Sequence, residues 1–555
     1  MLVFWKMNKQ GLKEEIMKKR CRKLNSNLIF LGCIFVIGLL AVFPYGAHLD
    51  QTSEQEILYS NIKVYARLVG ADNSLYQELD AAGIVDITES IEKDHGMAVF
   101  YPVAWIFFLN KISSFSGNII WHGYIYVLTF CGVAALFYLM SDIWGGHIVP
   151  IFTTLLFFFT PRMFAESHYN NKDIILLSLV LCIAFFGWRT CQKKTWLNVI
   201  GFALAGSLAA NMKIIGAFIW GMAGIYILLA LLIRRQLDKK VILKIIAGIS
   251  IWFGFYLLIT PACWTGLPGF WQYLLESARN FRWNDYILFA GKMYSKNTTG
   301  MPVMYLPVMI ILTVPVGILL LAGTGIISLL FSLVRFRRKS PDGAWYMFVM
   351  ILACLIPLGY AIVSRTPVYN GWRHFYFTYM AVLLSAACGI SWLLNRFKSP
   401  RLRKSLVISL SAYVFVLAAS IALAYPHEYA YYNLLAGKNV VERYELDYWD
   451  MSFKQAYEKI LPEPDEVKIP VEKIRIGTIS NPAYWGLEEQ LNVIRGKQRM
   501  YVDLCTDFRD AEYLIINPTY ALMYGASDYK YVKENYILKD SITSYGNVIC
   551  EIYHK

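Results

Sequence analysis

Residues 48–56 read His48-Leu49-Asp50-Gln51-Thr52-Ser53-Glu54-Gln55-Glu56 and closely follow an apolar segment at 27–46. An apolar segment of about 20 residues is long enough to span a bilayer as a helix. Carboxylates at the end of such a helix are costly unless they face protein or water, which makes them functional candidates. The run is therefore either a solvated loop with a helix-capping acid or part of a functional site.

The composition is typical of a membrane protein. The chain has 555 residues, of which 57% are hydrophobic, and a mean hydropathy of +0.42. Soluble domains contain fewer apolar residues. The net charge of +14 could suit nucleic acid, but the basic residues form short clusters between apolar segments. Such clusters are typical of contact with membrane lipids, so no nucleic-acid partner is predicted.

The ten cysteines are scattered, with no CxxC pair and no Cys/His spacing of a zinc site. These residues require neither a metal nor another cofactor, and a divalent metal stays open as an alternative. Cys505 and Cys550 lie in the polar C-terminal region, where a disulfide could form if that region is extracytoplasmic.

The apolar segments predict an all-α polytopic membrane domain over residues 27–425, with about eleven transmembrane helices. After the first span at 27–46, further spans are predicted at 119–140, 147–160, 171–190, 197–211, 214–233, 242–262, 305–333, 344–364, 374–395 and 405–425. The segments 147–160 and 197–211 are short for spans. The end of the loop between the first two spans, at 97–112, is aromatic and predicts a helix lying in the membrane interface.

The distribution of Lys and Arg predicts the orientation. The N-terminal residues 1–26 are basic, and alternate connections between later spans carry further basic clusters. This positive-inside pattern places residues 1–26 in the cytoplasm. An odd number of spans then places the large loop 47–118 and residues 426–555 outside, and we expect a multi-pass protein of a bacterial plasma membrane.

Residues 426–555 differ in kind from the membrane domain because they are mostly polar. Short β-like runs occur at 474–479, 512–516 and 548–553, and an amphipathic stretch occurs near 483–493. This pattern predicts a small extracytoplasmic α/β domain.

Carboxylates and cationic groups gather in the loops that are predicted to lie outside. Arg binds a phosphate with two parallel hydrogen bonds and Lys binds it as a point charge, whereas a carboxylate suits a general base. For Arg373 and Lys213 the alternative is contact with lipid headgroups. For Lys172 and Asp173 it is a local salt bridge or a helix N-terminus. His95 and His168 are weak signals when taken singly.

Five motifs follow one another on the predicted outer side. They are His48-Leu49-Asp50; Asp94-His95-Gly96; Pro161-Arg162-Met163-Phe164-Ala165 with Asn170-Asn171-Lys172-Asp173; Gly371-Trp372-Arg373-His374-Phe375; and Pro426-His427-Glu428-Tyr429-Ala430-Tyr431-Tyr432-Asn433 with Glu445-Leu446-Asp447-Tyr448-Trp449. In this order and placement the chain resembles the GT-C membrane glycosyltransferases. The resemblance is to the branch related to dolichyl-phosphate-mannose–protein mannosyltransferases (glycosyltransferase family 39-like) and to lipid A aminoarabinose transferases.

The resemblance implies a glycosyltransferase with an inverting mechanism. The donor would be a sugar on a polyprenyl phosphate, either a mannose-like hexose or a pentose, and the acceptor a hydroxyl of a protein, lipid or glycan. Asp50 would be the catalytic base, with Glu54 as the second acid. We expect Lys213, Arg373 and His374 to bind the donor phosphate. The pocket residues would be Asp94, His95, Asn171, Lys172 and Asp173.

One departure from the family pattern concerns position 51, where the family often has Glu directly after the Asp and this chain has Gln51. Glu54 lies one helical turn after Asp50 and could face the same way. The departure leaves open whether Asp50 acts alone and whether a metal-binding pair of acids exists.

Elementary chemistry agrees with a single base. A polyprenyl phosphate leaves as a stable anion, so cations that hold it replace the general acid that glycoside hydrolysis needs. Two other classes remain as alternatives: a transporter or flippase of lipid-linked saccharides, and a polymerase or ligase of longer lipid-linked glycans. Transporters usually place their charges at the midplane between repeated halves, and this sequence shows neither feature.

Overall fold

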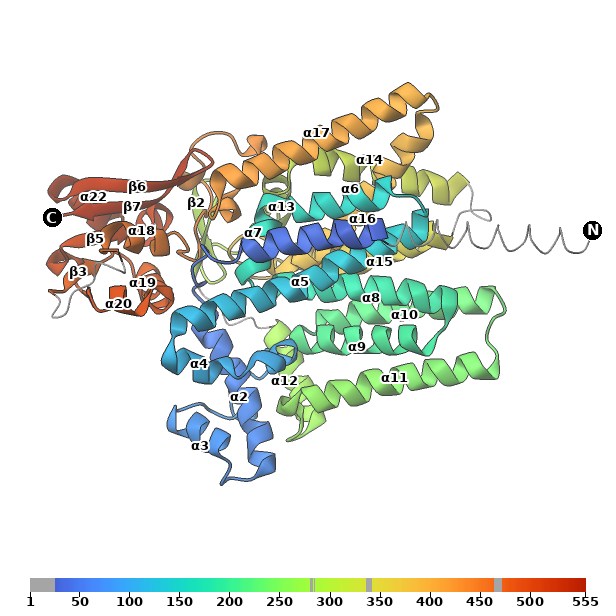
Figure 1. Ribbon diagram of the computed structural model, residues 1–555, viewed down its shortest axis with the longest axis horizontal. Coiled ribbons are helices and arrows are strands. Elements are labelled where there is room, and N and C mark those ends of the chain that lie inside the picture. Colours follow the sequence, from blue (N-terminus) through green and yellow to red (C-terminus); the bar gives the residue numbers. More distant parts are fainter. Residues whose placement is uncertain (1–24, 280–282, 284, 336–341, 464–471) are drawn as a thin grey trace, which may run out of the picture.

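The computed structural model describes residues 25–279, 283, 285–335, 342–463 and 472–555. The predicted cytoplasmic N-terminus, 1–26, lies outside these residues except for its last two positions. Long helices run side by side along the long axis of the molecule, and a C-terminal domain with a β-sheet lies beyond one end of them (Figure 1).

Eight helical segments among the described residues are long and apolar enough to cross a membrane. They are α5 (Ser114–Trp144), α8 (Asp173–Lys193), α10 (Ile215–Ile233), α11 (Lys239–Ile259), α14 (Val316–Arg335), α15 (Asp342–Val363), η3 (Arg373–Thr378) continued by α16 (Tyr379–Arg396), and α17 (Pro400–Ala424). The predicted polytopic helical membrane protein is confirmed.

By length and apolar composition, fewer helices among the described residues qualify as spans than the predicted eleven. A bent pair, α6 (Ile148–Phe158) and α7 (Pro161–Tyr169), turns by 67° and brings the total to nine if it is one span. The predicted spans at 27–46 and 197–211 correspond to shorter apolar helices, Asn25–Leu40 and α9 (Trp196–Met212). The predicted span at 305–333 is broken at Pro315, between α13 (Tyr305–Thr313) and α14, because proline lacks the N–H that a continuous helix requires.

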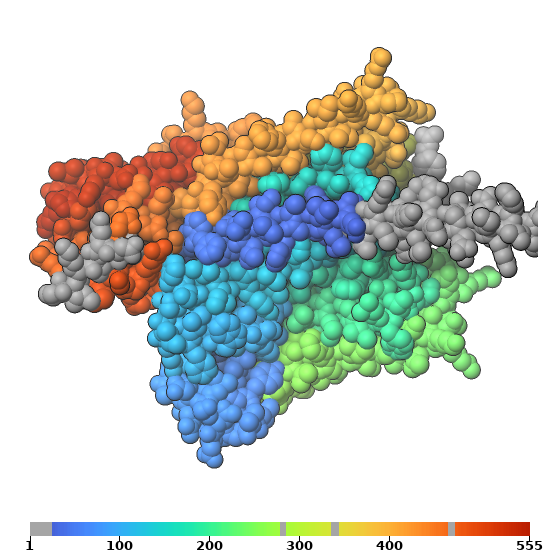
Figure 2. All heavy atoms as spheres, viewed as in Figure 1, coloured from blue at the N-terminus to red at the C-terminus, as the bar shows by residue number. Residues whose placement is uncertain are grey.

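The loop 47–118 is mostly helical. It contains α2 (Gln51–Val69), α3 (Ser74–Ala81), η1 (Ala98–Val103) and α4 (Ile106–Ile112). The single interfacial helix predicted at 97–112 is wrong in form, since two short helices occupy this stretch and Pro102 lies within the first. In Figure 2 the region of α2 and α3 protrudes from one side of the molecule.

Between α11 and α13 the chain forms η2 (Pro261–Cys263), α12 (Leu267–Arg279) and a two-stranded hairpin of β1 (Tyr286–Phe289) and β2 (Lys292–Ser295). After α17 it forms η4 (Glu428–Ala430), η5 (Leu434–Ala436), η6 (Val440–Glu442) and α18 (Phe453–Ile460). The residues from 426 to 460 connect the membrane helices to the sheet domain.

The C-terminal domain has a five-stranded mixed sheet in the order β4-β3-β5-β7-β6. The strands are β3 (Ile474–Gly477), β4 (Val502–Leu504), β5 (Tyr513–Ile516), β6 (Ile537–Ser544) and β7 (Asn547–His554). The helices are α19 (Asn481–Val493), α20 (Gly496–Arg499), η7 (Phe508–Asp510), α21 (Pro518–Tyr524) and α22 (Ala526–Asn535). The predicted α/β domain is confirmed, and Cys505 and Cys550 are both free thiols within it.

The helices differ in how deeply they are buried. In the most apolar 18-residue stretch, 67% of α8 and 72% of η3–α16 are buried. The corresponding shares are 17% for α11 and 22% for α17. Helices α8 and α16 therefore form the centre of the bundle. Side chains at their N-terminal ends are positioned by rigid, well-packed elements.

Candidate functional site

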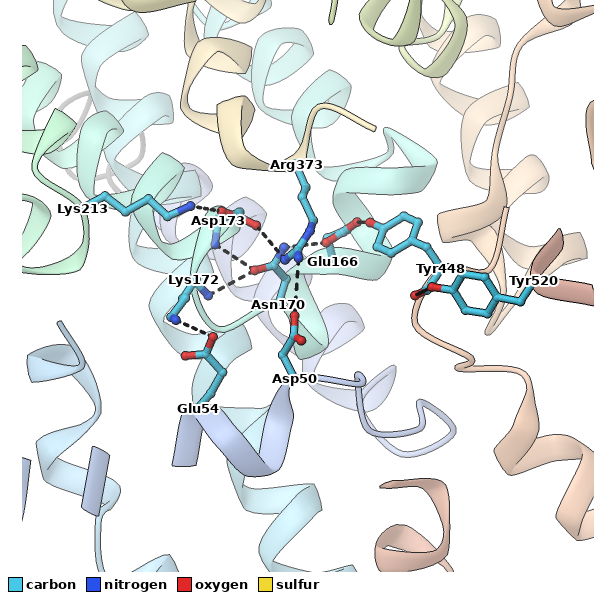
Figure 3. Close-up of polar contacts among 10 residues, drawn as sticks. All are labelled: Asp50, Glu54, Glu166, Asn170, Lys172, Asp173, Lys213, Arg373, Tyr448 and Tyr520. Carbon is cyan, nitrogen blue, oxygen red and sulfur yellow. Dashed lines mark hydrogen bonds and ion pairs between the residues drawn. The ribbon is translucent and has the colours of Figure 1, made fainter. Parts of the chain in front are cut away.

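Six of the predicted site residues form one group at the ends of helices, which we call the ion-pair cluster: Asp50, Glu54, Lys172, Asp173, Lys213 and Arg373 (Figure 3). Asp50 occupies the N-cap of α2, Lys172 the N-cap of α8 and Lys213 the C-cap of α9. Because these positions lie where helices begin or end, the charges avoid the apolar middle of the bundle.

Asp50 is placed at a helix N-cap but does not act as a cap. Among the described residues its side chain accepts no capping hydrogen bond from α2. Its Oδ2 instead lies 3.4 Å from Nη2 of Arg373, and the side chain is 44% exposed. The alternative of a helix-capping acid is therefore wrong, and the carboxylate keeps an open side.

Glu54 lies one turn after Asp50 on α2 and faces the same cluster, as expected from its spacing. Its Oε1 is 2.5 Å from Nζ of Lys172, and the two side chains are only 10% and 12% exposed. Lys172 does begin a helix, as one alternative proposed, but its charge is paired with Glu54 on another helix.

Asp173 joins two cations from distant parts of the chain. Its Oδ1 is 2.5 Å from Nζ of Lys213, and its Oδ2 is 3.5 Å from Nη1 of Arg373. The side chain is 2% exposed. Arg373 thus stands between a buried carboxylate, Asp173, and a half-exposed one, Asp50.

Arg373 is fixed by aromatic rings as well as by carboxylates. Its Cζ lies 4.9 Å from the ring centres of both Tyr369 and Trp449, within the range of cation–π attraction. The residue is 7% exposed, so contact with lipid headgroups does not account for its position. Trp449 comes from the segment after the last membrane helix, and this segment therefore forms part of the wall of the site.

The structure explains the departure at position 51. The side chain of Gln51 is buried and faces α5, where its Nε2 donates to Oδ1 of Asn118 at 2.9 Å and its Oε1 lies 3.0 Å from Nε2 of His122. Position 51 therefore points away from the ion-pair cluster. The second acid near Asp50 is Glu54.

His48 and His374 border the cluster. His48 is buried against the ring of Trp449, at 5.0 Å between ring centres. Burial lowers the pKa of His48 to about 4, and the nearby Arg373 and Lys172 act in the same direction. His48 is therefore neutral at physiological pH. The ring of His374 packs edge-on against Tyr369 at 4.8 Å.

Asp94 and His95 lie in a different pocket from the ion-pair cluster. Asp94 accepts a hydrogen bond from Ser277, and Nδ1 of His95 is 2.9 Å from Oε2 of Glu92. The pocket is also lined by Asn211 and Thr260. Within the described residues neither Asp94 nor His95 bonds to a member of the cluster, so the structure does not bring all predicted pocket residues together.

One group near that pocket has metal-ligating atoms. Glu92, Asp94 and His95 each offer one ligand atom, and these atoms lie within 4.8 Å of one another. Such a group could hold a metal ion by geometry. The residues are only partly buried, and acidic groups of this kind are common without an ion. The prediction that the site needs no metal stays a prediction.

The other predicted pocket residue, Asn171, is buried beside Lys172 at the start of α8, with 2% of its surface exposed. Four residues that the sequence had not assigned also contribute: Glu166, Asn170, Tyr448 and Trp449. Asn170, Tyr448 and Trp449 belong to motifs quoted from the sequence, and Glu166 directly follows one of these motifs. These residues are recognised by their contacts in the folded chain: Tyr448, for example, bonds to Glu166, which is 282 positions away. The sequence does not show contacts over such a separation.

The cluster balances its own charge, with three carboxylates and three cations. The contacts differ in closeness, because Lys172–Glu54 and Lys213–Asp173 are 2.5 Å apart and Arg373–Asp50 is 3.4 Å apart. Arg373 is also 3.5 Å from Asp173, so a further anion at Arg373 would compete with the two longest contacts of the cluster. The arrangement can therefore bind a phosphate and present a carboxylate beside it.

No protein-family model and no curated protein matches the sequence. Among solved structures the chain is similar to ArnT from Cupriavidus metallidurans in the apo state, with 11% identity, a TM-score of 0.44, and coverage of 96% of this chain and 98% of that chain. It is also similar to the same protein bound to undecaprenyl phosphate, with 12% identity, a TM-score of 0.45, and coverage of 95% and 97%. Membership of a family does not follow from a likeness at this level.

Proposed function

We propose that the protein is an integral-membrane glycosyltransferase. It moves a sugar, a mannose-like hexose or a pentose, from a polyprenyl-phosphate carrier to an acceptor hydroxyl of a protein, lipid or glycan. The observation that carries the proposal is the position of Asp50, a 44% exposed carboxylate beside the buried Arg373 on the open side of a cluster with two further cations.

The cations support binding of the donor phosphate. Arg373 offers a planar fork of donors, and Lys172 and Lys213 add point charges. Of the two carboxylates that contact Arg373, Asp50 is the one that an arriving phosphate can replace most easily, because it is 44% exposed and Asp173 is only 2% exposed. Replacement releases Asp50 to accept a proton.

The proposed reaction is a single displacement. The acceptor oxygen forms a bond to the anomeric carbon while the bond from that carbon to the phosphate oxygen breaks. Asp50 takes the hydroxyl proton, and the polyprenyl phosphate leaves with the electron pair as an anion held by Arg373 and the lysines. Attack opposite to the leaving group inverts the anomeric centre. Glu54, closely paired with Lys172, holds that lysine in place.

The location of the charges favours a transferase over a transporter. All six members of the ion-pair cluster lie at or within one turn of helix ends, on the side of the C-terminal domain. Substrate sites of transporters usually lie near the midplane on broken helices. We infer that the reaction takes place at the membrane surface beside the C-terminal domain, on the side that the basic connections predict to be extracytoplasmic.

The test is sugar release in detergent, where no compartments exist. Purified wild type, Asp50→Asn and Glu56→Gln are incubated with radiolabelled polyprenyl-phosphate hexoses and pentoses, with membrane extract as the source of acceptors. Glu56 is an exposed acid on the same helix and serves as the matched control. We expect turnover by wild type and by the control, and a loss of about 10²–10⁴-fold in Asp50→Asn.

Two results would contradict the proposal. Full activity of Asp50→Asn, with the same thermal unfolding as wild type, would remove Asp50 as the base. Binding of a lipid-linked sugar by wild type without turnover of any donor would favour the transporter. Because the Asp50 side chain is 44% exposed and makes no capping hydrogen bond to α2, its replacement is expected to leave the fold intact.

A further inference from the structure

A buried acid behind the ion-pair cluster makes hydrogen bonds to η3, to the residue before Asn171 at the end of α7, and to the segment that follows the last membrane helix. Glu166 on α7 is fully buried. Its Oε2 accepts a hydrogen bond from Nδ2 of Asn170 at 2.7 Å. Its Oε1 accepts from the hydroxyls of Tyr376 and Tyr448, each at 2.8 Å. The proposed reaction does not use this carboxylate.

The Asn170 contact leads to Lys172 and Asp173. Oδ1 of Asn170 accepts from the backbone N–H of Lys172 at 3.1 Å and of Asp173 at 2.8 Å. These two residues begin α8, where backbone N–H groups have no partner within the helix. Asn170 therefore sets the start of the helix that places both side chains in the cluster (Figure 3).

The two tyrosine contacts lead to Arg373. Tyr376 lies three residues after Arg373 in η3. Tyr448 is followed directly by Trp449, whose ring packs on the Arg373 guanidinium at 4.9 Å. The carbonyl of Tyr448 in turn accepts a hydrogen bond from the hydroxyl of Tyr520, at 2.6 Å, on α21 of the C-terminal domain. One carboxylate thus joins α7, η3 and the segment that leads into the C-terminal domain.

We propose that Glu166 is a positioning residue of the site, which holds Asn170, Tyr376 and Tyr448 so that Arg373, Lys172 and Asp173 stay at the spacing that binds the donor phosphate. The proposal rests on the proposed function for the identity of the ligand. It also assigns a role to the C-terminal domain: through Tyr520 and Tyr448 the domain supports the side of Arg373 that Trp449 covers.

The hydrogen bond from Asn170 to Glu166 can be tested with variants at these two positions. Asn170 cannot rotate its amide without losing the two backbone contacts of its oxygen. In Asn170→Asp, a carboxylate oxygen would face Oε2 of Glu166, and two buried acids would repel each other. In the double variant Glu166→Gln with Asn170→Asp, the side-chain N–H of the new glutamine donates to the new aspartate. The amide oxygen of the glutamine accepts from the hydroxyls of Tyr376 and Tyr448. The formal charge of the two positions together equals that of wild type.

The first measurement is binding of undecaprenyl phosphate to folded, monodisperse protein in detergent. We expect Asn170→Asp to weaken binding by about tenfold or more and the double variant to return to within about threefold of wild type, as coupled neighbours do. A purely structural role would lower the yield or the melting temperature and leave the affinity of the folded fraction unchanged. Unchanged affinity in Asn170→Asp, or no recovery in the double variant, would overturn the proposal.

The second measurement keeps the proposal testable if Asn170→Asp does not fold. Tyr448→Phe removes one hydrogen bond to Glu166, and Tyr529→Phe removes a similar bond to Glu551, at 2.7 Å, inside the C-terminal domain. We expect only Tyr448→Phe to weaken binding and to lower kcat. Equal effects of the two variants would overturn the positioning role.

Hydrogen exchange separates this inference from the proposed function. If wild type binds no polyprenyl phosphate, the proposed function fails, but exchange still reports on Glu166. We expect Tyr448→Phe to speed amide exchange in the peptides covering 170–176 and 373–378, both of which lie away from the substituted residue in sequence. Unchanged exchange in both peptides would overturn the inference independently of the ligand.

Discussion

Carboxylates occur in two settings at the end of the molecule that carries the C-terminal domain. In the ion-pair cluster, Asp50, Glu54 and Asp173 each face a cation. Behind and beside the cluster, Glu428 accepts from the hydroxyl of Tyr45, and Asp447 accepts from Ser452 and from backbone N–H groups. The first set faces cations and the second is held by neutral donors.

The difference follows from the cost of burying charge. A buried carboxylate without a cation shifts its pKa upward and takes a proton. Burial raises the pKa of Glu428 to about 8, and also that of Glu445 to about 8. Ion pairs are thus present where a charged ligand is proposed to bind, and neutral acids are present where the chain joins two domains.

After Asp50→Asn, the largest expected effect concerns Arg373. Arg373→Gln should lower kcat/KM by about 10²–10³-fold, because the leaving phosphate loses its forked donor and Asp173 loses one of its two cations. Arg373→Lys keeps the charge and loses the fork, so we expect an intermediate loss. The measurement is donor turnover at several donor concentrations. Equal activity of all three proteins would show that the cluster is structural, like the neutral acids.

The next effect concerns the pair of Glu54 and Lys172, which are nearly buried. Removing one partner of a buried pair leaves a charge without compensation and typically costs about 3–5 kcal/mol. We expect Glu54→Gln and Lys172→Met to lower the melting temperature in detergent more than the double variant does. Additive losses would mean that the two charges do not depend on each other.

A smaller effect concerns the pH dependence of stability. Because the pKa of Glu428 is raised from 4.5 to about 8, the folded state binds more protons than the unfolded state between these values. Stability should therefore fall as the pH rises from about 4.5 to 8. Glu428→Gln should reduce this slope and be more stable than wild type at pH 8. Glu445, whose pKa is also raised, should still contribute to the remaining slope.

The control for that series is Glu534→Gln, an acid on α22 that is 61% exposed and pairs with Lys530, which is 78% exposed. Its melting temperature should follow that of wild type across the pH range, since exposed pairs contribute little. A wild-type profile that does not change with pH would contradict the assignment of neutral buried acids.

The smallest effect concerns Gln51→Glu, which introduces the acid that the family pattern often has at this position. The side chain faces Asn118 and His122, away from the cluster. We expect no gain in turnover and a loss of about 1–3 kcal/mol in stability, from the changed hydrogen bonding of a buried group. Increased turnover would show that position 51 reaches the site.

Much of the fold was determined by local patterns in the sequence. Hydropathy placed the membrane helices, and the alternation of apolar residues placed β3, β5 and β7, because these signals depend only on neighbouring residues. Asp50 was identified for the same reason, as an acid at the end of an apolar segment. The bend between α6 and α7 and the division of the predicted span at 305–333 depend on how these helices pack, and hydropathy does not report that.

The ion pairs and their supports were decided by the tertiary structure. Asp50 and Arg373 are 323 positions apart, and Tyr448 and Glu166 are 282 apart. Over such separations no local pattern states which charges meet. The sequence grouped Asp94 and His95 with the site and left Glu166 unassigned, whereas the folded chain places the first two in another pocket and puts Glu166 behind the cluster. The sequence alone supplied the charged groups and the side of the membrane on which they are expected, and packing of distant elements chose their partners.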